Sequence, residues 1–163
     1  MKIAVGSDDR TQLTKAVIDD LRKRGHTVIP IGPLAENEGN DSGTDDGSAD
    51  WPLTSGGVAQ AVARGDADEG IVFCWTGTGA SIAANKVDGV RAALCQDAET
   101  ARGARTYNHA NVLAISLRAT SEGVAKEILE AWFATPFGDD EWNRRQIDRI
   151  RELEERNGRK AEA

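Results

Sequence analysis

The feature of the sequence that most restricts its fold is a series of short apolar runs that alternate with helical patterns. The runs contain few polar residues, which is typical of strands buried on both faces of a parallel sheet. We therefore predict an α/β protein with a doubly wound, five-stranded parallel sheet of the Rossmann-like type and helices on both faces. The predicted strands are Lys2–Ser7, Thr27–Ile31, Gly70–Cys74, Val90–Leu94 and Val112–Ser116.

The segments between these runs have apolar residues spaced as on one face of a helix. In the first of them, Leu13, Val17 and Leu21 recur every four residues, and Gly25 is suited to end the helix. Asp97 is suited to cap the fourth helix. The predicted helices are Thr11–Arg24, Leu53–Arg64, Ala80–Lys86, Asp97–Tyr107 and Ser121–Phe133.

Length and charge limit the classes of protein to which the chain can belong. Its 163 residues suit one domain, which we place at residues 1–150. The 27 acidic residues outnumber the 20 basic residues, so we expect no nucleic-acid partner. No apolar run is long enough for a membrane span, and the first residues pass directly into a strand without a signal sequence. We therefore expect a cytoplasmic protein.

Two charged segments lie outside the strand and helix pattern. Residues 36–50 hold six acidic residues and no basic residue, without hydrophobic periodicity, and we predict an acidic surface loop there. Residues 139–163 carry both signs of charge with a narrow apolar stripe, which predicts an extra C-terminal helix. Such a helix packs against its own domain or against a partner subunit.

In a doubly wound sheet the ligand lies beyond the carboxyl ends of the strands, near the point where the strand order reverses. The residues that follow the first, third and fifth strands are therefore the first candidates for a site. These segments are Ser7–Asp9, Cys74–Ala80 and Leu117–Arg118.

The segment Cys74–Ser81, which reads CWTGTGAS, carries the most chemical information. A strand ends in cysteine, a glycine–threonine turn follows, and a helix begins, so successive backbone N–H groups are exposed where positive charge gathers. Such a turn can hold an anion or a developing enolate oxygen, and the same field favours the thiolate form of a nearby thiol. Cys74 is therefore a candidate nucleophile or base, with a buried strand-end thiol as the alternative. Cys95 has no such turn, and we assign it to the core.

Three known glycine-rich motifs do not fit this segment. A P-loop needs lysine after its last glycine, and a dinucleotide fingerprint needs a third glycine where Ile82 stands. A cysteine phosphatase loop needs arginine at position 80, where the chain has alanine.

Further polar residues lie around the fourth helix and the strands beside it. Asn85, Lys86 and Arg91 follow the glycine turn, and Tyr107–Asn111 links the fourth helix to the fifth strand. We expect the side chains of Tyr107–Asn111 to reach the carboxyl edge of the sheet. For Asn111 alone, helix capping is the expected role.

Several motifs together resemble the ribose-5-phosphate isomerase B and galactose-6-phosphate isomerase family over residues 2–150. The most specific is the block from Cys74 to Lys86. The others are Gly6-Ser7-Asp8, Asp50-Trp51-Pro52, Gly89-Val90-Arg91-Ala92-Ala93, Asn108-x-x-Asn111-Val112-Leu113 and Arg118.

The resemblance implies a sugar-phosphate isomerase that converts aldoses to ketoses through a cis-enediolate, without a metal or organic cofactor. It also implies a homodimer or homotetramer whose active sites are shared between subunits. Cys74 would move the proton between C1 and C2, and Thr76 with the backbone N–H groups of Gly77–Gly79 would hold the enediolate oxygens. Asp8 would contact sugar hydroxyls, Asn108 would bind substrate oxygens, and Arg118 and Arg145 would belong to a phosphate clamp supplied partly across the dimer. Further candidate site residues are Asp9, Trp75, Thr78, Ser81 and Tyr107.

The sequence departs from the family pattern where charge and size matter. Asp9 and Tyr107 replace histidines, Glu141-Trp142 stands where an arginine–histidine pair is usual, and Trp75 replaces glycine. Cationic donors are thereby lost from the expected phosphate end. We therefore predict another sugar phosphate or a less charged sugar as substrate, rather than ribose 5-phosphate.

The same departures keep two questions open. One alternative function is a sugar-binding protein that has lost the isomerase chemistry together with its histidines. Opening of the sugar ring is left to Tyr107, Asp9, His109 or solvent.

Overall fold

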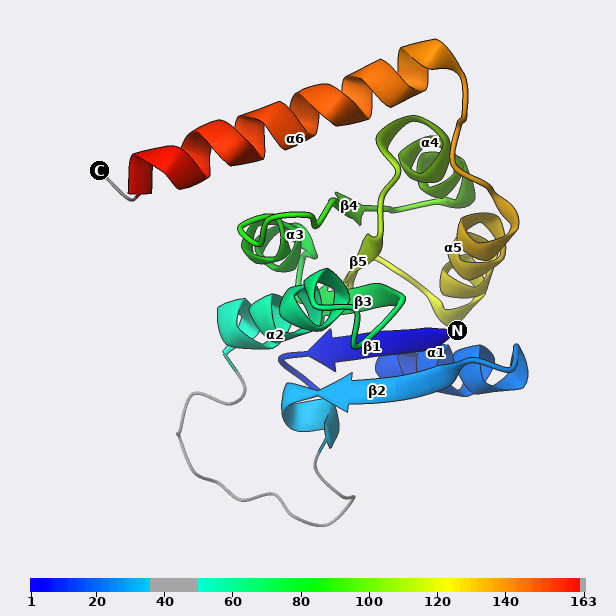
Figure 1. The fold of residues 1–163 in the computed structure, drawn as a ribbon. Helices are drawn as coiled ribbons and strands as arrows, with labels where there is room; N and C mark the ends of the chain where they lie inside the picture. Colours follow the sequence, from blue (N-terminus) through cyan, green and yellow to red (C-terminus); the bar gives the residue numbers. More distant parts are fainter. Residues whose placement is uncertain (36–49, 162–163) are drawn as a thin grey trace.

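A computed structural model describes residues 1–35 and 50–161, with the side chains described up to residue 158 (Figure 1). The predicted acidic loop lies outside the described residues, except for Asp50 at its end. The described residues form one five-stranded sheet in the order β2-β1-β3-β5-β4, with every neighbouring pair parallel. The strands are β1 (Lys2–Ser7), β2 (Thr27–Ile31), β3 (Glu69–Cys74), β4 (Ala92–Leu94) and β5 (Val112–Ser116).

Helices connect the strands and cover both faces of the sheet, which confirms the predicted fold class. The predicted helix boundaries are close to the observed ones, although a short 3-10 helix after β2 was not predicted. The helices are α1 (Gln12–Lys23), η1 (Gly32–Ala35), α2 (Trp51–Ala63), α3 (Thr78–Ala84), α4 (Ala98–Asn108), α5 (Glu122–Ala134) and α6 (Glu141–Ala161). No helix in the described ranges is long and apolar enough to cross a membrane.

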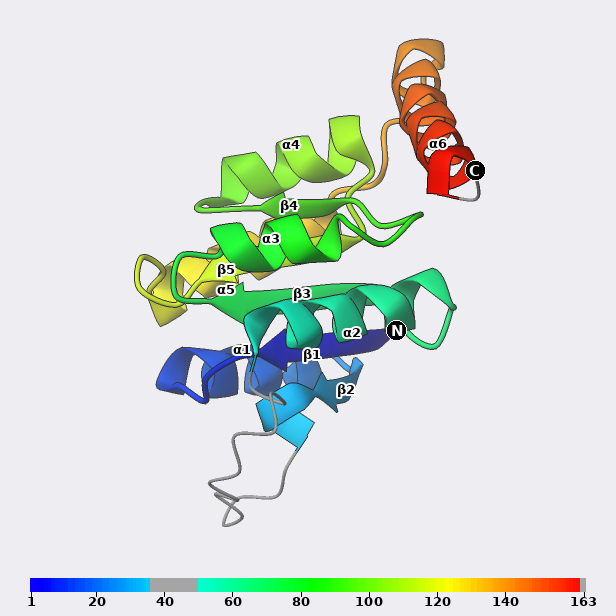
Figure 2. The same cartoon turned by 90° about the vertical axis from the view of Figure 1, so that its left-hand side faces the viewer.

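Alternate strand residues point to two different cores. Ile71 and Phe73 of β3 pack with α1, α4 and α5, whereas Val72 and Cys74 pack with α2 and α3. The α2 side is close to the sheet because Gly6 and Gly70 face it: a Cβ atom on Gly70 would lie 2.6 Å from a methyl group of Val58. Figure 2 shows α2 and α3 side by side on that face.

The edge strand β4 is shorter than predicted because side chains take the place of strand neighbours at its start. Asn85 accepts a hydrogen bond from the N–H of Ala92 at 2.8 Å and donates to the carbonyl of the same residue at 2.8 Å. Asn111 accepts from the N–H of Arg91 at 2.8 Å and donates to the carbonyl of Gly89 at 2.9 Å. Asn111 therefore supports the chain before β4, and the expected helix-capping role is wrong.

A buried ion pair joins the amino end of β3 to α4 and α5. Arg105 Nη2 lies 2.7 Å from Glu69 Oε1, and Trp132 Nε1 donates to Glu69 Oε2 at 2.6 Å. The Arg105 guanidinium also donates to the carbonyl of Ala110 at 2.7 Å and lies 4.3 Å from the ring centre of Phe137. Burial raises the pKa of Glu69 even though Arg105 and Trp132 act in the opposite direction. Desolvation is thus the largest influence on this carboxylate.

The helix α6 lies outside the helices that cover the two faces of the sheet, and the start of α6 packs against α4 (Figures 1 and 2). The segment before it is docked on the end of α4: the Gly138 N–H donates to the carbonyl of Thr106 at 3.0 Å, and His109 Nε2 lies 2.8 Å from the carbonyl oxygen of Gly138. The ring of Phe137 stacks on His109 at 4.7 Å. In α6, Ile147 is buried and Leu153 is largely exposed, so the predicted apolar stripe is only partly covered within one chain.

The N-cap of α4 gives one test of acid stability. As predicted, the Asp97 side chain accepts from the N–H of Thr100, at 2.7 Å, and this bond lowers the pKa of Asp97 below 3.8. A folded-state pKa below the unfolded value means that the cap stabilises the protein above the unfolded pKa and ceases to do so as the pH falls through the folded pKa. We therefore expect Asp97→Asn to flatten the acid limb of a plot of melting temperature against pH. An unchanged limb would contradict this role for Asp97.

Candidate active site

The carboxyl ends of β1, β3 and β5 lie next to one another and place three predicted site segments together. The strand register pairs Ser7 with Phe73 and Cys74 with Ser116. Asp8 and Cys74 therefore follow neighbouring positions on strands about 4.8 Å apart. Cys74 is 6% exposed at this edge.

The turn after Cys74 is fastened to the residues that follow β5. The carbonyl of Cys74 accepts from the N–H of Leu117 at 3.0 Å. The carbonyl of Trp75 accepts from Ser116 Oγ at 3.0 Å and from the N–H of Arg118 at 3.1 Å. These bonds fix the backbone on either side of the thiol, and they bring the exposed Arg118 to the same edge of the sheet.

The shape of the turn depends on Gly77. Its φ is +76°, and a Cβ atom there would lie 2.5 Å from Leu94 Cδ1 and 3.1 Å from backbone atoms of β5. The Gly77 N–H donates to the carbonyl of Cys74 at 3.2 Å, and its contact with a ligand oxygen stays a prediction. The next amides, of Thr78 and Gly79, open α3, where the first N–H groups have no partner inside the helix.

We expect Gly77→Ala to disturb the turn severely. The substitution puts a Cβ atom on a left-handed backbone, where it overlaps with the side chain of Leu94. Backbone strain of this kind costs about 1–3 kcal/mol. Unfolding in urea and isomerase activity should both reveal the change. As a control, Gly65→Ala has a similar φ of +77° but no atom within 4 Å of the new Cβ, so it should lose stability while keeping activity per folded molecule. Equal activity losses in the two variants would contradict a special role for the Gly77 turn.

Polar groups next to the turn differ in their exposure and in whether they have a hydrogen-bond partner. Thr76 Oγ1 and Thr78 Oγ1 lie 2.6 Å apart, and both residues are exposed. Asp8 Oδ1 is buried and has no hydrogen-bond partner among the described residues. Burial is the main cause that raises the pKa of Asp8, and the negative charge of Asp9 adds to it. Asp8 is thus a partly buried carboxyl group with one oxygen that the described residues leave without a partner.

Comparison with known proteins identifies the family. Residues 3–151 match the family model described as Ribose/Galactose Isomerase. The chain is 37% identical to the galactose-6-phosphate isomerase subunit LacB of Clostridium acetobutylicum over 94% of this chain and 83% of that protein. It is 35% identical to the D-erythrulose-4-phosphate isomerase of Pectobacterium atrosepticum over 84% of this chain and 85% of that protein. The chain belongs to the ribose/galactose isomerase family.

A solved structure agrees with this assignment. The ribose-5-phosphate isomerase B of Clostridium thermocellum superposes with a TM-score of 0.83 at 37% identity, covering 96% of this chain and 99% of that one. The predicted family and the predicted enzyme class, an aldose–ketose isomerase, are therefore confirmed.

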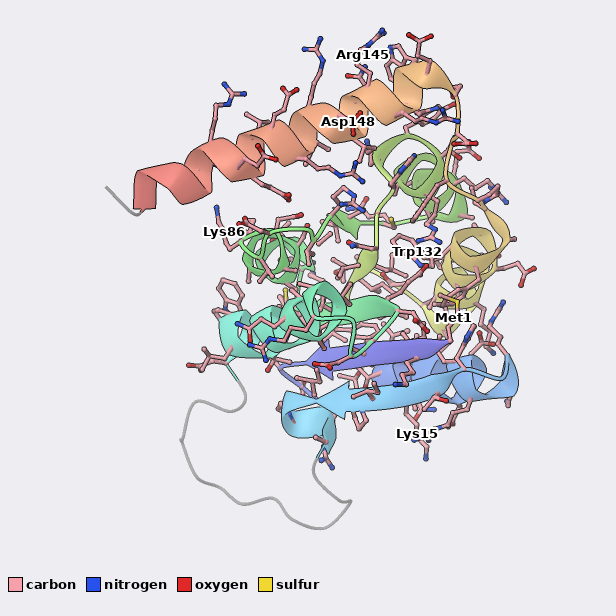
Figure 3. All side chains as sticks on the ribbon, in the orientation of Figure 1. Met1, Lys15, Lys86, Trp132, Arg145 and Asp148 are labelled. Carbon is pink, nitrogen blue, oxygen red and sulfur yellow. The ribbon has the colours of Figure 1, made fainter. Side chains whose placement is uncertain are left out.

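The structure separates three predicted site residues of this isomerase from Cys74. Tyr107 and Asn108 end α4, which runs toward the amino end of β5, so the expectation that they reach the carboxyl edge is wrong for a single chain. The five residues of β5 separate the two edges, which is about 13 Å at the rise of a strand. Arg145 is exposed near the start of α6 and points away from the sheet (Figure 3).

Two further residues are committed to contacts within the chain. Ser81 Oγ donates to the carbonyl of Ala92 at 3.3 Å, so its hydroxyl braces α3 against β4. His109, one of the residues considered for ring opening, holds the carbonyl of Gly138 and stacks on Phe137.

One neighbour of the site was not assigned a role from sequence. The ring of Trp51, the first residue of α2, covers Gly79, because a Cβ atom on that glycine would lie 3.1 Å from it. The motif Asp50-Trp51-Pro52 drew attention to this residue. Its position beside the turn could not be predicted, because only the strand order brings α2 there. No group of three or more His, Cys, Asp or Glu side chains placed to bind a metal occurs within the described residues.

Proposed function

We propose that this isomerase interconverts an aldose phosphate and a ketose phosphate, with Cys74 as the base. The proposal is supported by the place of Cys74 in the chain: it ends β3 directly before the turn that opens α3, and the strand register puts it next to the segment that contains Asp8. A base and an oxyanion site at adjacent positions are what proton transfer next to a carbonyl requires.

The proton path can be written for the open-chain aldose. The Cys74 thiolate removes the proton from C2, the electron pair of that C–H bond forms the C1–C2 double bond, and the carbonyl oxygen on C1 becomes an enediolate oxygen. The amides of Thr78 and Gly79 and the hydroxyl of Thr76 stabilise this charge. The thiol returns the proton to C1, and the proton of the C2 hydroxyl passes to the C1 oxygen, which leaves a hydroxyl on C1 and the ketose carbonyl at C2. Thus no net proton is gained or lost.

The phosphate requires groups that one chain does not collect around Cys74. Arg118 is a cation at the carboxyl edge, whereas Tyr107, Asn108 and Arg145 lie elsewhere. We therefore propose that a second copy of the chain supplies these three residues, in a homodimer or homotetramer with shared sites. A cytoplasmic location stays a prediction.

Subunit mixing tests the proposal. Cys74→Ala and Asn108→Ala should each be inactive, and the two chains refolded together should recover activity. Random pairing gives one intact mixed site in half of the dimers, which predicts about a quarter of the wild-type rate. Refolding each variant alone is the control. Absence of recovery in mixtures that form dimers would contradict the shared site, and a wild-type protein that binds sugar phosphates without turnover would support the binding-protein alternative.

A further inference from the structure

The segment between α5 and α6 is fixed to the end of α4 through Gly138 (Figure 1). The Gly138 N–H donates to the carbonyl of Thr106 at 3.0 Å, and Nε2 of His109 lies 2.8 Å from the Gly138 carbonyl oxygen. A carbonyl oxygen only accepts, so Nε2 carries the hydrogen and donates it. Gly138 also packs against α6, because a Cβ atom on it would lie 2.5 Å from Nδ2 of the buried Asn143. We call Thr106, His109, Gly138 and Asn143 the Gly138 anchor.

The backbone of His109 has an uncommon conformation. Among the described residues it is the one non-glycine residue with a positive φ, +48°, and it ends α4 in the left-handed region. Its ring stacks on Phe137 at 4.7 Å, and its carbonyl accepts from Arg91 Nε at 2.9 Å. A conformation of this kind persists where the surroundings fix it. Here the stack and the hydrogen bond to Gly138 fix it.

The Gly138 anchor lies between two residues that the proposed function takes from a second copy of the chain. Asn108 directly precedes His109 at the end of α4, and Arg145 follows Asn143 by two residues in α6. A shift of Gly138 against His109 therefore moves Arg145 relative to Asn108.

We infer that His109 is a positioning residue, which holds Asn108 and Arg145 in one fixed arrangement for the site of the partner subunit. This inference rests on the proposed function, because only there does a second copy supply both residues.

Two substitutions of His109 separate its hydrogen bond from its backbone conformation. Asparagine adopts the left-handed region readily, but its amide stands where Nδ1 stands in histidine and is too short to reach Gly138. Glutamine places an amide donor where Nε2 stands, adopts the left-handed region less readily, and cannot carry a proton. We therefore expect His109→Gln to keep more activity than His109→Asn.

The first measurement is kcat/KM with whichever of ribose 5-phosphate, galactose 6-phosphate and erythrulose 4-phosphate the wild type converts fastest. A displacement of about 1 Å can cost about 100-fold in rate, so His109→Asn should lower kcat/KM by at least about tenfold. His109→Gln should keep most of the wild-type value. Equal losses in the two variants, or a larger loss in His109→Gln, would overturn the inference.

Subunit mixing shows in which half of the site the loss acts. Mixed with Cys74→Ala, the His109→Asn chain supplies an intact Cys74 and receives an intact Asn108, so activity should recover to about a quarter of the wild-type rate. Mixed with Asn108→Ala, every site has a displaced or a missing Asn108, and recovery should be about tenfold lower. General damage to the fold would lower both mixtures alike and would overturn the inference.

The other histidine is the matched control. The ring of His26 lies 4.5 Å from the ring of Phe133 in α5, so His26→Asn removes a similar contact without changing the Gly138 anchor and should keep the wild-type kcat/KM. If Cys74→Ala and Asn108→Ala do not restore each other, the shared site of the proposed function is contradicted, and this inference with it. If they do, and His109→Asn restores Asn108→Ala equally well, only the inference is overturned.

Discussion

Cys74→Ala is expected to lower isomerase turnover by about 10²–10⁴-fold, the usual contribution of a positioned acid–base group. Cys74 lies at the end of a buried strand, beside the turn whose amides can hold a developing negative charge. Alanine keeps the small apolar volume but cannot accept a proton. The loss should therefore appear in kcat, with sugar-phosphate binding largely retained.

The second cysteine provides a matched control for this substitution. Cys95 is fully buried, and burial raises the pKa of its thiol to about 12. Its Sγ lies 3.7 Å from the carbonyl oxygen of Ala93, with no glycine turn beside it. Cys95→Ala should retain nearly full turnover, and iodoacetamide should inactivate the wild type and the Cys95→Ala variant at equal rates. Turnover retained in Cys74→Ala, or lost in Cys95→Ala without unfolding, would contradict the assignment.

The largest loss of stability is expected from breaking the buried Glu69–Arg105 pair. Removing one partner of such a pair leaves an uncompensated charge and costs about 3–5 kcal/mol. Glu69→Gln keeps an acceptor for Trp132 Nε1 but removes the charge opposite Arg105, whose guanidinium is about one-tenth exposed. The free energy of unfolding in urea should fall accordingly.

A double substitution tests whether an uncompensated buried charge causes this loss of stability. Because burial raises the pKa of Glu69, the cost of desolvation is the main effect at this site. Glu69→Leu combined with Arg105→Met should therefore be more stable than Glu69→Leu alone. The control is the ion pair between Arg24 and Glu130, in which Glu130 is largely exposed. Glu130→Gln should change the free energy of unfolding by less than about 1 kcal/mol. A loss for Glu69→Gln no larger than for Glu130→Gln would contradict the account.

Most of the fold could be predicted because strand burial and helix periodicity are local patterns. The run Gly70–Cys74 is apolar on both faces, and the structure buries every residue of β3. The start of β4 could not be predicted in the same way. The run Val90–Leu94 is apolar except for Arg91, and the Asn111 side chain, twenty residues away, accepts the hydrogen bond of the Arg91 N–H.

The candidate site could be predicted in part for a similar reason. Residues that directly follow parallel strands share one edge, so Asp8, Cys74 and Arg118 could be grouped from sequence. Tyr107 and Asn108 follow a helix instead, and a helix that crosses back returns its last turn to the opposite edge. The free oxygen of Asp8, the engaged amide of Gly77 and the cover of Gly79 by Trp51 depend on packing between elements.

The most direct measurement of the central claim is deuterium entry at C2 of the aldose phosphate in D₂O, followed by NMR at reaction equilibrium. The wild type and Cys95→Ala should both incorporate deuterium at C2. Folded Cys74→Ala should incorporate deuterium about 10²–10⁴-fold more slowly than the wild type, since the thiolate is the group that carries the proton. Exchange by Cys74→Ala at the wild-type rate would show that another group removes the C2 proton, and would contradict the account.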